Sequence, residues 1–156
     1  MTDLDLGALA LGWIAAYGAP MLAAILLLSA AGVPLPATLL VIASGAFVRQ
    51  ELLDLYFTPL LGLVGTVAGD LALYGLGRLA SPWIERRFGR TEAWRQAREL
   101  FERRGGWAVF LTRWLLTALA FPVTLVAGSS RYRFRRFLVL DLAGEATWLG
   151  LYGGLG

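Results

Sequence analysis

"PATLLVIASG", residues 36–45, is an apolar segment that begins with proline, and a similar segment, "PVTLVAGSS", occupies residues 122–130. Each has threonine two positions after the proline, then apolar residues, then glycine beside serine. The recurrence predicts two related half-sites in one chain, although chance similarity between apolar segments remains an alternative. The matching positions are Pro36 and Pro122, and Thr38 and Thr124.

The composition around these segments is that of a membrane protein. Of the 156 residues, 58% are hydrophobic, and the mean hydropathy is +0.65. A soluble domain of this length cannot bury so much apolar surface, because small domains have a high ratio of surface to volume. Residues 6–48 contain no acid or base, and residues 55–77 and 105–130 contain one each. Each run is long enough for the roughly 20 residues of a bilayer-spanning helix.

The residues that are missing exclude several functions. The chain has no cysteine and no histidine, which excludes disulfides, thiol chemistry, the usual zinc sites and histidine catalysis. We therefore expect no enzyme, no metal and no cofactor. All 14 basic residues are arginine, whose guanidinium binds phosphate in a bidentate manner. The pI of about 9.8 favours contact with anionic membrane lipids over nucleic acid.

Prolines and charges predict the path of the chain. We expect spans at Ala8–Ala30, Thr58–Gly77 and Phe137–Leu155. Pro34 and Pro36 interrupt the first apolar run, so Val33–Val48 is predicted as a re-entrant hairpin of two half-helices. Gly106–Ser130 is predicted as a second hairpin, broken near Phe121–Pro122.

The distribution of arginines supports the second hairpin. Residues 78–104 hold eight arginines against four glutamates, and "RYRFRR", residues 131–136, adds four more arginines. A spanning segment at 106–130 would place these two basic clusters on opposite faces of the membrane, which the positive-inside rule disfavours. We therefore expect both clusters and the N-terminus to be cytoplasmic, in the inner membrane of a bacterium. Between the hairpins, Thr91 and Gly105 punctuate an amphipathic surface helix, and Pro82 begins a shorter one.

The predicted fold is an all-α integral membrane protein with an inverted repeat of two opposed hairpins, each followed by a transmembrane helix. Repeat one covers about residues 31–78, the interfacial helices about 81–104, and repeat two about 106–156. "AGDLALYG" and "AGEATWLGLYG" follow the two hairpins and extend the repeat. Inverted repeats of this kind place a transport site near the bilayer midplane.

Four charged residues lie at predicted membrane depth: Asp70, Arg113, Asp141 and Glu145. Each costs about 2.5–3.5 kcal/mol on insertion scales, so each requires a partner or a function. We expect Arg113 to meet a lipid phosphate, with Asp70 and Glu145 binding protons or orienting the arginine; ion pairing that only supports the fold is the alternative. Asp141 is expected to be hydrated near the interface. Tyr74 is predicted to hydrogen-bond to Asp70, and Arg78 to reach the cytoplasmic surface.

These residues resemble the DedA family, whose shared region is also called the VTT or SNARE-associated domain. "GTVAGDLALYGLGR", residues 65–78, is similar to the family's G-x-x-x-G-D-x-x-x-Y-x-x-G-R. Residues 101–148 resemble the family's second conserved region, from F-x-x-x-G to the final G and W. The chain departs from the family around the first hairpin, where Ser29 and Thr38 stand at the places of the family's two acids and Ala37 at that of a glycine. It therefore resembles a divergent or short member.

The resemblance implies movement of lipid head groups between leaflets, with undecaprenyl phosphate or phospholipids as the substrates. Phosphate-bearing membrane lipids are the expected partners, and the sequence leaves open a homo-oligomer. The first alternative is a transporter of a small ion or solute on the same scaffold. A closed polar site would favour that alternative, and a laterally open groove would favour lipid. A structural protein that maintains the envelope is the second alternative.

Overall fold

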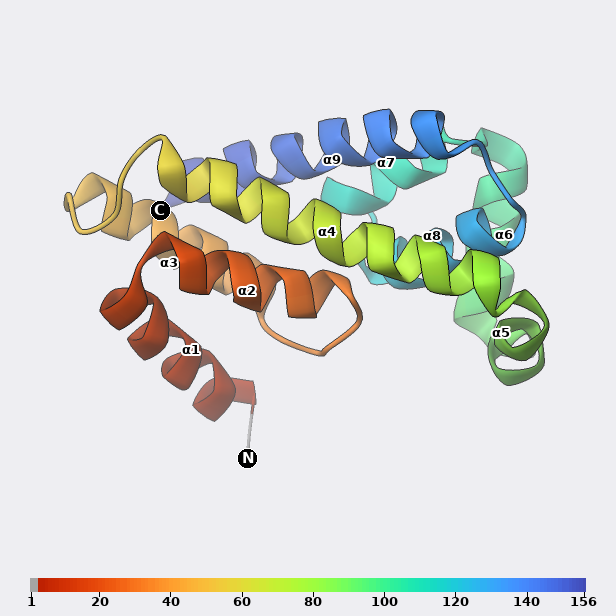
Figure 1. The fold of residues 1–156 in the computed structure, drawn as a ribbon, viewed down its shortest axis with the longest axis horizontal. Helices are drawn as coiled ribbons and strands as arrows, with labels where there is room; N and C mark the ends of the chain where they lie inside the picture. The colour runs from red at the N-terminus through yellow and green to blue at the C-terminus, as the bar shows by residue number, and fades with distance from the viewer. Residues whose placement is uncertain (1–2) are drawn as a thin grey trace. The chain divides into compact units, whose positions relative to one another are not determined.

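The computed structural model describes residues 3–156, and all of the regular structure in that range is helical. The chain divides into two compact units. Unit 1 comprises the residues up to Gly69 together with Ala146–Gly156, and unit 2 comprises Asp70–Glu145. Two long helices, α4 (Phe57–Leu79) and α9 (Phe134–Leu155), contribute to both units (Figure 1). The all-helical prediction is therefore confirmed.

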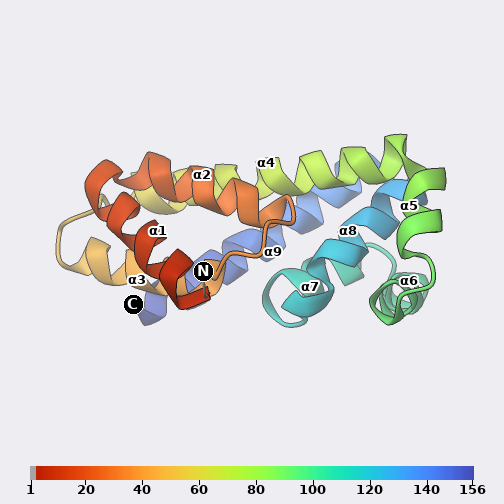
Figure 2. The ribbon, with the colours of Figure 1, turned by 90° about the horizontal axis from the view of Figure 1, so that it is seen from below.

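Three helices pack against one another in unit 1: α1 (Asp3–Tyr17), α2 (Ala19–Ala30) and α3 (Ala37–Arg49) (Figure 2). The predicted single span Ala8–Ala30 is wrong, because Gly18 separates α1 from α2 with a φ of 71°, a left-handed conformation that favours glycine. Pro20 lies in the first turn of α2, where its missing N–H removes no helical hydrogen bond.

The first predicted hairpin also needs correction. Within Val33–Val48 the chain forms a short connection and then the single helix α3, rather than two half-helices. Pro36 lies at the position immediately before α3, and its carbonyl accepts a hydrogen bond from the backbone of Leu40 at 3.1 Å. Pro36 therefore begins a helix, as proline does readily, and does not divide one.

The two long helices coincide closely with the predicted spans Thr58–Gly77 and Phe137–Leu155. By length and apolar composition, α4 is the one helix in the described range that can cross a membrane unaided. Helix α9 has 22 residues but is less apolar, because it carries arginines in its first turn and two acids further along. The shorter apolar helices lie at residues 5–17, 19–30, 37–49 and 117–129.

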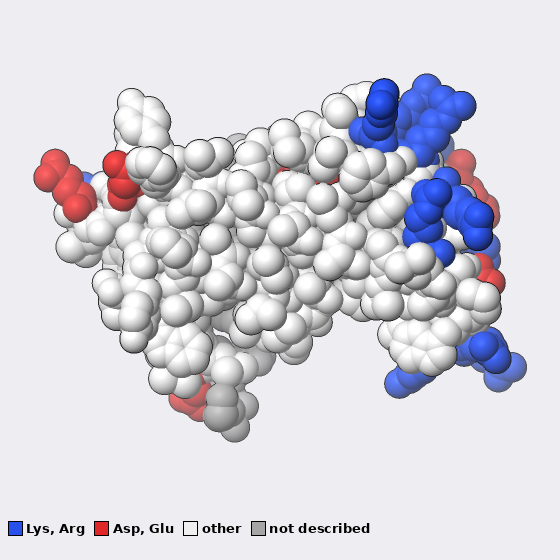
Figure 3. All heavy atoms as spheres, in the orientation of Figure 1, with Lys and Arg blue, Asp and Glu red and all other residues white. Residues whose placement is uncertain are grey.

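Two helices of unit 2 match the prediction for the surface region. Helix α5 (Ser81–Phe88) has Pro82 in its first turn, and α6 (Glu92–Arg104) begins after Thr91, whose hydroxyl accepts the backbone N–H of Trp94 at 3.3 Å. Gly105 ends α6 with a φ of 56°. On the exposed face of α6, hydrogen bonds from Arg95 lower the pKa of the Glu92 carboxyl. Arginines gather over this part of unit 2 (Figure 3).

The segment predicted as the second hairpin folds as α7 (Trp107–Trp114), a short 3₁₀ turn (Thr117–Leu119) and α8 (Ala120–Ser129). The break therefore lies before Phe121–Pro122, and Pro122 occupies the first turn of α8. The two ends of the segment lie together, because a Cβ on Gly106 would meet the Tyr132 ring and hydroxyl. The rings of Phe101 and Tyr132 pack edge to face, with centroids 5.3 Å apart.

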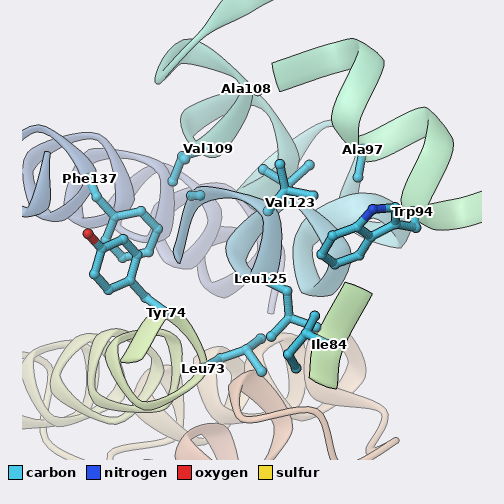
Figure 4. Close-up of a cluster of buried hydrophobic side chains, with 12 residues drawn as sticks. Leu73, Tyr74, Ile84, Trp94, Ala97, Ala108, Val109, Val123, Leu125 and Phe137 are labelled. Atoms are coloured by element: carbon cyan, nitrogen blue, oxygen red, sulfur yellow. The ribbon is translucent and has the colours of Figure 1, made fainter. Parts of the chain in front are cut away.

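The core of unit 2 lies where α4 to α9 meet (Figure 4). Tyr74 of α4 stacks on Phe137 of α9, with ring centroids 4.6 Å apart. Glycine allows α4 to approach α8 closely: a Cβ on Gly77 would lie 2.6 Å from the Leu125 carbonyl oxygen. In unit 1, Gly65 and Gly69 allow the same close approach to the backbone of α2.

Candidate functional site

Arg113 is the centre of a buried cluster of charged side chains in unit 2. It lies in the last turn of α7 and is only 4% exposed. Its Nε lies 2.6 Å from Asp141 Oδ1 and 3.5 Å from Glu145 Oε1, and its Nη2 lies 3.2 Å from Asp70 Oδ1. Three acids therefore surround one guanidinium in the interior of an apolar protein.

Two helices supply the acidic partners of Arg113. Asp70 comes from α4, whereas Asp141 and Glu145 are four residues apart on α9 and so share one face of that helix. Between them in the sequence, Gly144 is packed against Arg113, since a Cβ there would lie 2.7 Å from Arg113 Cγ. The absence of a side chain at Gly144 lets α9 bring its two carboxyl groups to the guanidinium.

Thr124 of α8 completes the surroundings of Arg113. Arg113 Nη2 donates a hydrogen bond to Thr124 Oγ1 at 2.9 Å, and the threonine hydroxyl donates in turn to the Ala120 carbonyl at 2.9 Å. Thr124 has no exposed surface. The threonine of the second proline-led segment, on α8, is thus hydrogen-bonded to the arginine of α7.

The acids of this cluster outnumber its cation. One guanidinium faces three carboxyl groups, whose oxygens lie within 4.8 Å of one another. Ionised carboxylates at this separation repel one another, and one guanidinium balances only one of the three negative charges. The second carboxyl oxygens of Asp70 and Asp141 have no donor against them in the described part of the chain. The arrangement thus requires protons, or a cation of the hard type that carboxylates bind, to balance the excess negative charge.

Two other predicted residues form a separate group on α4. Tyr74 does not bond to Asp70 as predicted, because its hydroxyl donates to the backbone carbonyl of Tyr132. Arg78 Nη1 donates to the Tyr74 oxygen at 3.1 Å, and the arginine is exposed. These contacts fix the start of α9 against α4 and do not reach the charged cluster.

The remaining predicted residues are distributed between the units. Pro122 is buried in the first turn of α8, two residues before Thr124. Pro36 and Thr38 belong to unit 1, at the beginning of α3, and both are partly buried. The structure describes no polar contact of the Thr38 side chain comparable to that of Thr124.

Asp141 is the site residue that sequence reasoning did not assign. We expected it to be hydrated near the interface, but it has no exposed surface and makes the shortest contact to Arg113. The sequence feature that could have placed Asp141 in the cluster is its spacing of four residues from Glu145. This spacing brings both carboxyl groups to one face of α9.

The profile of the VTT domain matches residues 35–156, which cover α3 to α9 and the whole of the charged cluster. The chain belongs to the VTT-domain (DedA) family. This VTT protein is 28% identical over 139 residues to an uncharacterized membrane protein of Haemophilus influenzae, an alignment that covers 84% of the chain and 65% of the relative. It is 32% identical over 94 residues to an uncharacterized membrane protein of Mycobacterium tuberculosis, covering 58% of the chain and 40% of the relative.

Both relatives are longer than this VTT protein, which spans 65% of the first and 40% of the second within the aligned regions. No solved structure matches the chain. The family and the relatives agree with the composition in making this a membrane protein.

Proposed function

We propose that this VTT protein moves a phosphate-bearing lipid, undecaprenyl phosphate or a phospholipid, between the leaflets of the bacterial inner membrane. The observation that carries the proposal is the single buried guanidinium of Arg113, shared among Asp70, Asp141 and Glu145 at 2.6–3.5 Å. Arginine matches phosphate geometry in a bidentate manner, and a membrane-embedded arginine is costly unless it has a partner or a function.

The excess of carboxyl groups provides a way to release Arg113. While the carboxylates are ionised, they hold the guanidinium and repel a phosphate. When the carboxyl groups take up protons, their attraction for Arg113 falls, and an anionic head group then competes favourably for it. Head-group binding and protonation are thereby linked, because each favours the state in which Arg113 is released from the carboxyl groups. Asp70, Asp141 and Glu145 are the coupling residues in this scheme, and Thr124 is a positioning residue.

The second hairpin supplies the path to the membrane surface. We infer that residues 106–130 enter and leave the bilayer on the cytoplasmic side, as the re-entrant half of an inverted repeat. The contacts of Gly106 and Phe101 with Tyr132 support this inference, because they bring the two arginine-rich segments to the same end of the hairpin. The N-terminus is then cytoplasmic by the positive-inside rule.

A second candidate is transport of a small ion or solute. It is favoured by the closure of the site, because Arg113, Asp70, Asp141 and Glu145 are each at most 7% exposed. The lipid proposal therefore includes an open state in which the head group reaches Arg113. The structural alternative predicts no movement of either kind of substrate.

Reconstitution in liposomes tests the proposal. Purified protein is placed in vesicles that carry either a fluorescent phospholipid or a labelled polyprenyl phosphate, with and without a proton gradient, and leaflet exchange is followed by quenching from outside. We expect exchange above that of protein-free vesicles, lost in Arg113→Gln and kept in Arg95→Gln, which changes an exposed arginine. Absence of exchange with both lipids and in both conditions would contradict the lipid proposal.

A further inference from the structure

Unit 1 contains a cavity of about 270 Å³ that has no part in the charged cluster. It lies between α2, α3, the beginning of α4 and the end of α9. Its wall is almost entirely apolar and includes Leu22, Val41, Val48, Leu149 and Gly153. The volume approaches that of small-molecule pockets, which begin at roughly 300 Å³.

Two buried hydroxyl groups line this apolar cavity, and one of them has no hydrogen-bond partner among the described residues. Thr58 is 3% exposed, and its hydroxyl oxygen has no hydrogen-bond partner among the described residues. By contrast, the Ser44 hydroxyl on the same wall donates to the Leu40 carbonyl at 2.7 Å. A buried hydroxyl without a partner is unfavourable, and a ligand oxygen in the cavity would satisfy it.

The mouth of the cavity is charged. Arg49 lies on the cavity wall, is exposed, and donates from Nη2 to the Gly154 carbonyl at 2.6 Å, which leaves its other N–H groups for a ligand. A neighbouring depression in the α3–α4 connection shares Val48, Arg49 and Leu55 with the cavity and adds Glu51 and Asp54. Acidic side chains are visible over this connection in Figure 3.

We propose that the cavity binds the acyl chain of a zwitterionic phospholipid with an amine head group, as a resident lipid. The apolar wall takes the chain, the Thr58 hydroxyl donates to an ester carbonyl of the lipid, and Arg49 binds the phosphate. Glu51 and Asp54 then face the ammonium group. A purely anionic head group is less well suited, because two carboxylates accompany one guanidinium at the mouth. The site does not depend on the proposed transport and is expected even if the protein moves no lipid.

Native mass spectrometry of the detergent-purified chain tests this site. The protein is incubated with phosphatidylethanolamine or phosphatidylglycerol of the same acyl composition, and the retained lipid is counted. We expect one phosphatidylethanolamine to be retained in preference to phosphatidylglycerol, and most of that retention to be lost in Gly153→Leu. A Cβ on Gly153 would lie 3.8 Å from Val41 Cγ1, so the new side chain fills the cavity without a clash at its first carbon.

Two further variants separate binding from folding. Gly12→Leu makes the same change in α1, where a Cβ meets nothing within 4 Å and no cavity wall is involved, so it should retain lipid as the wild type does. Thr58→Val removes the unpartnered hydroxyl, so it should raise the thermal stability of the lipid-free protein while lowering lipid retention. Equal retention by the wild type, Gly153→Leu and Thr58→Val would overturn the site. Equal retention of the two lipids would overturn the assignment of the head group.

Discussion

At the scale of single residues, Arg113 connects the stability of unit 2 with its proposed function. The guanidinium touches acids from α4 and α9 and a threonine from α8, so three helices depend on one cation. Desolvating these groups is costly, and the cost is offset only while the opposite charges remain together. Removing one member therefore affects stability far more than the removal of an exposed charge does.

The first prediction concerns the loss of this cation. We expect Arg113→Gln to destabilise the protein by about 3–5 kcal/mol near neutral pH, because buried carboxylates are left unpaired. The deficit should shrink as the pH falls, since protonated carboxyl groups need no cation. Thermal unfolding in detergent, measured across a pH series, provides the value. Arg95→Gln, which removes an exposed arginine, is the control and should show no resolvable change. A deficit that is independent of pH would contradict the account.

Sequence reasoning found most of this cluster but not all of it. Asp70, Arg113 and Glu145 were identifiable because charges inside uncharged runs require partners. Thr124 followed from the recurrence of the proline-led segment. Asp141 was assigned to the interface because it lies near the arginines at the start of α9. The number of residues between a side chain and the membrane boundary does not show whether a neighbouring helix buries that side chain. The predicted Tyr74–Asp70 bond failed because a backbone carbonyl, that of Tyr132, lies closer in the fold.

At the scale of helices, close approach between α4 and α8 depends on glycine. Gly77 and Gly128 lie at the contact, where a Cβ on Gly128 would meet the Tyr74 carbonyl and one on Gly77 the Leu125 carbonyl. Gly75 lies on the same helix, and a Cβ there would meet nothing within 4 Å. The two positions on α4 therefore make a matched pair for the same substitution.

We expect Gly77→Ala to destabilise the protein by about 1–3 kcal/mol, because the added methyl group forces the two backbones apart. Gly75→Ala should be neutral or stabilise by up to about 1 kcal/mol, since alanine favours the helix more than glycine does. Chemical or thermal unfolding of both variants under the same conditions gives the comparison. A loss of stability in Gly75→Ala that equals the loss in Gly77→Ala would show that helix contact is not the reason.

The helices that were predicted correctly are those with local punctuation. Thr91 caps α6 and Gly105 ends it, and Pro82 starts α5, so short-range chemistry determined their bounds. Gly18 was missed as a helix break because glycine is common inside membrane helices, and only the backbone conformation distinguishes a break from a packing position. The break after α7 was placed too late, since Pro122 is tolerated in the first turn of α8 and the chain turns earlier, near Leu115–Leu119.

At the scale of the whole molecule, the proposed topology places each connecting segment on a stated side of the membrane, and labelling of introduced cysteines can test this placement. The chain contains no cysteine, so a single introduced cysteine is a clean reporter. We expect Arg90→Cys and Arg133→Cys, one from each arginine-rich segment, to react with a membrane-impermeant maleimide only from the cytoplasmic side. Glu51→Cys, in the α3–α4 connection, should react only from the opposite side. Reaction of Arg90→Cys and Arg133→Cys from different sides would make residues 106–130 a span and would contradict the re-entrant hairpin.

In the proposed function, the guanidinium of Arg113 takes part in transport and does not only balance charge. The most direct measurement compares leaflet exchange by Arg113→Gln with exchange by the double variant Arg113→Gln/Asp141→Asn, at matched amounts of folded protein in liposomes. The double variant removes one cation and its closest acid together, so its stability should recover towards that of the wild type. We expect the double variant to recover its stability without recovering exchange. Exchange at the wild-type rate in the double variant would show that Arg113 serves the fold alone.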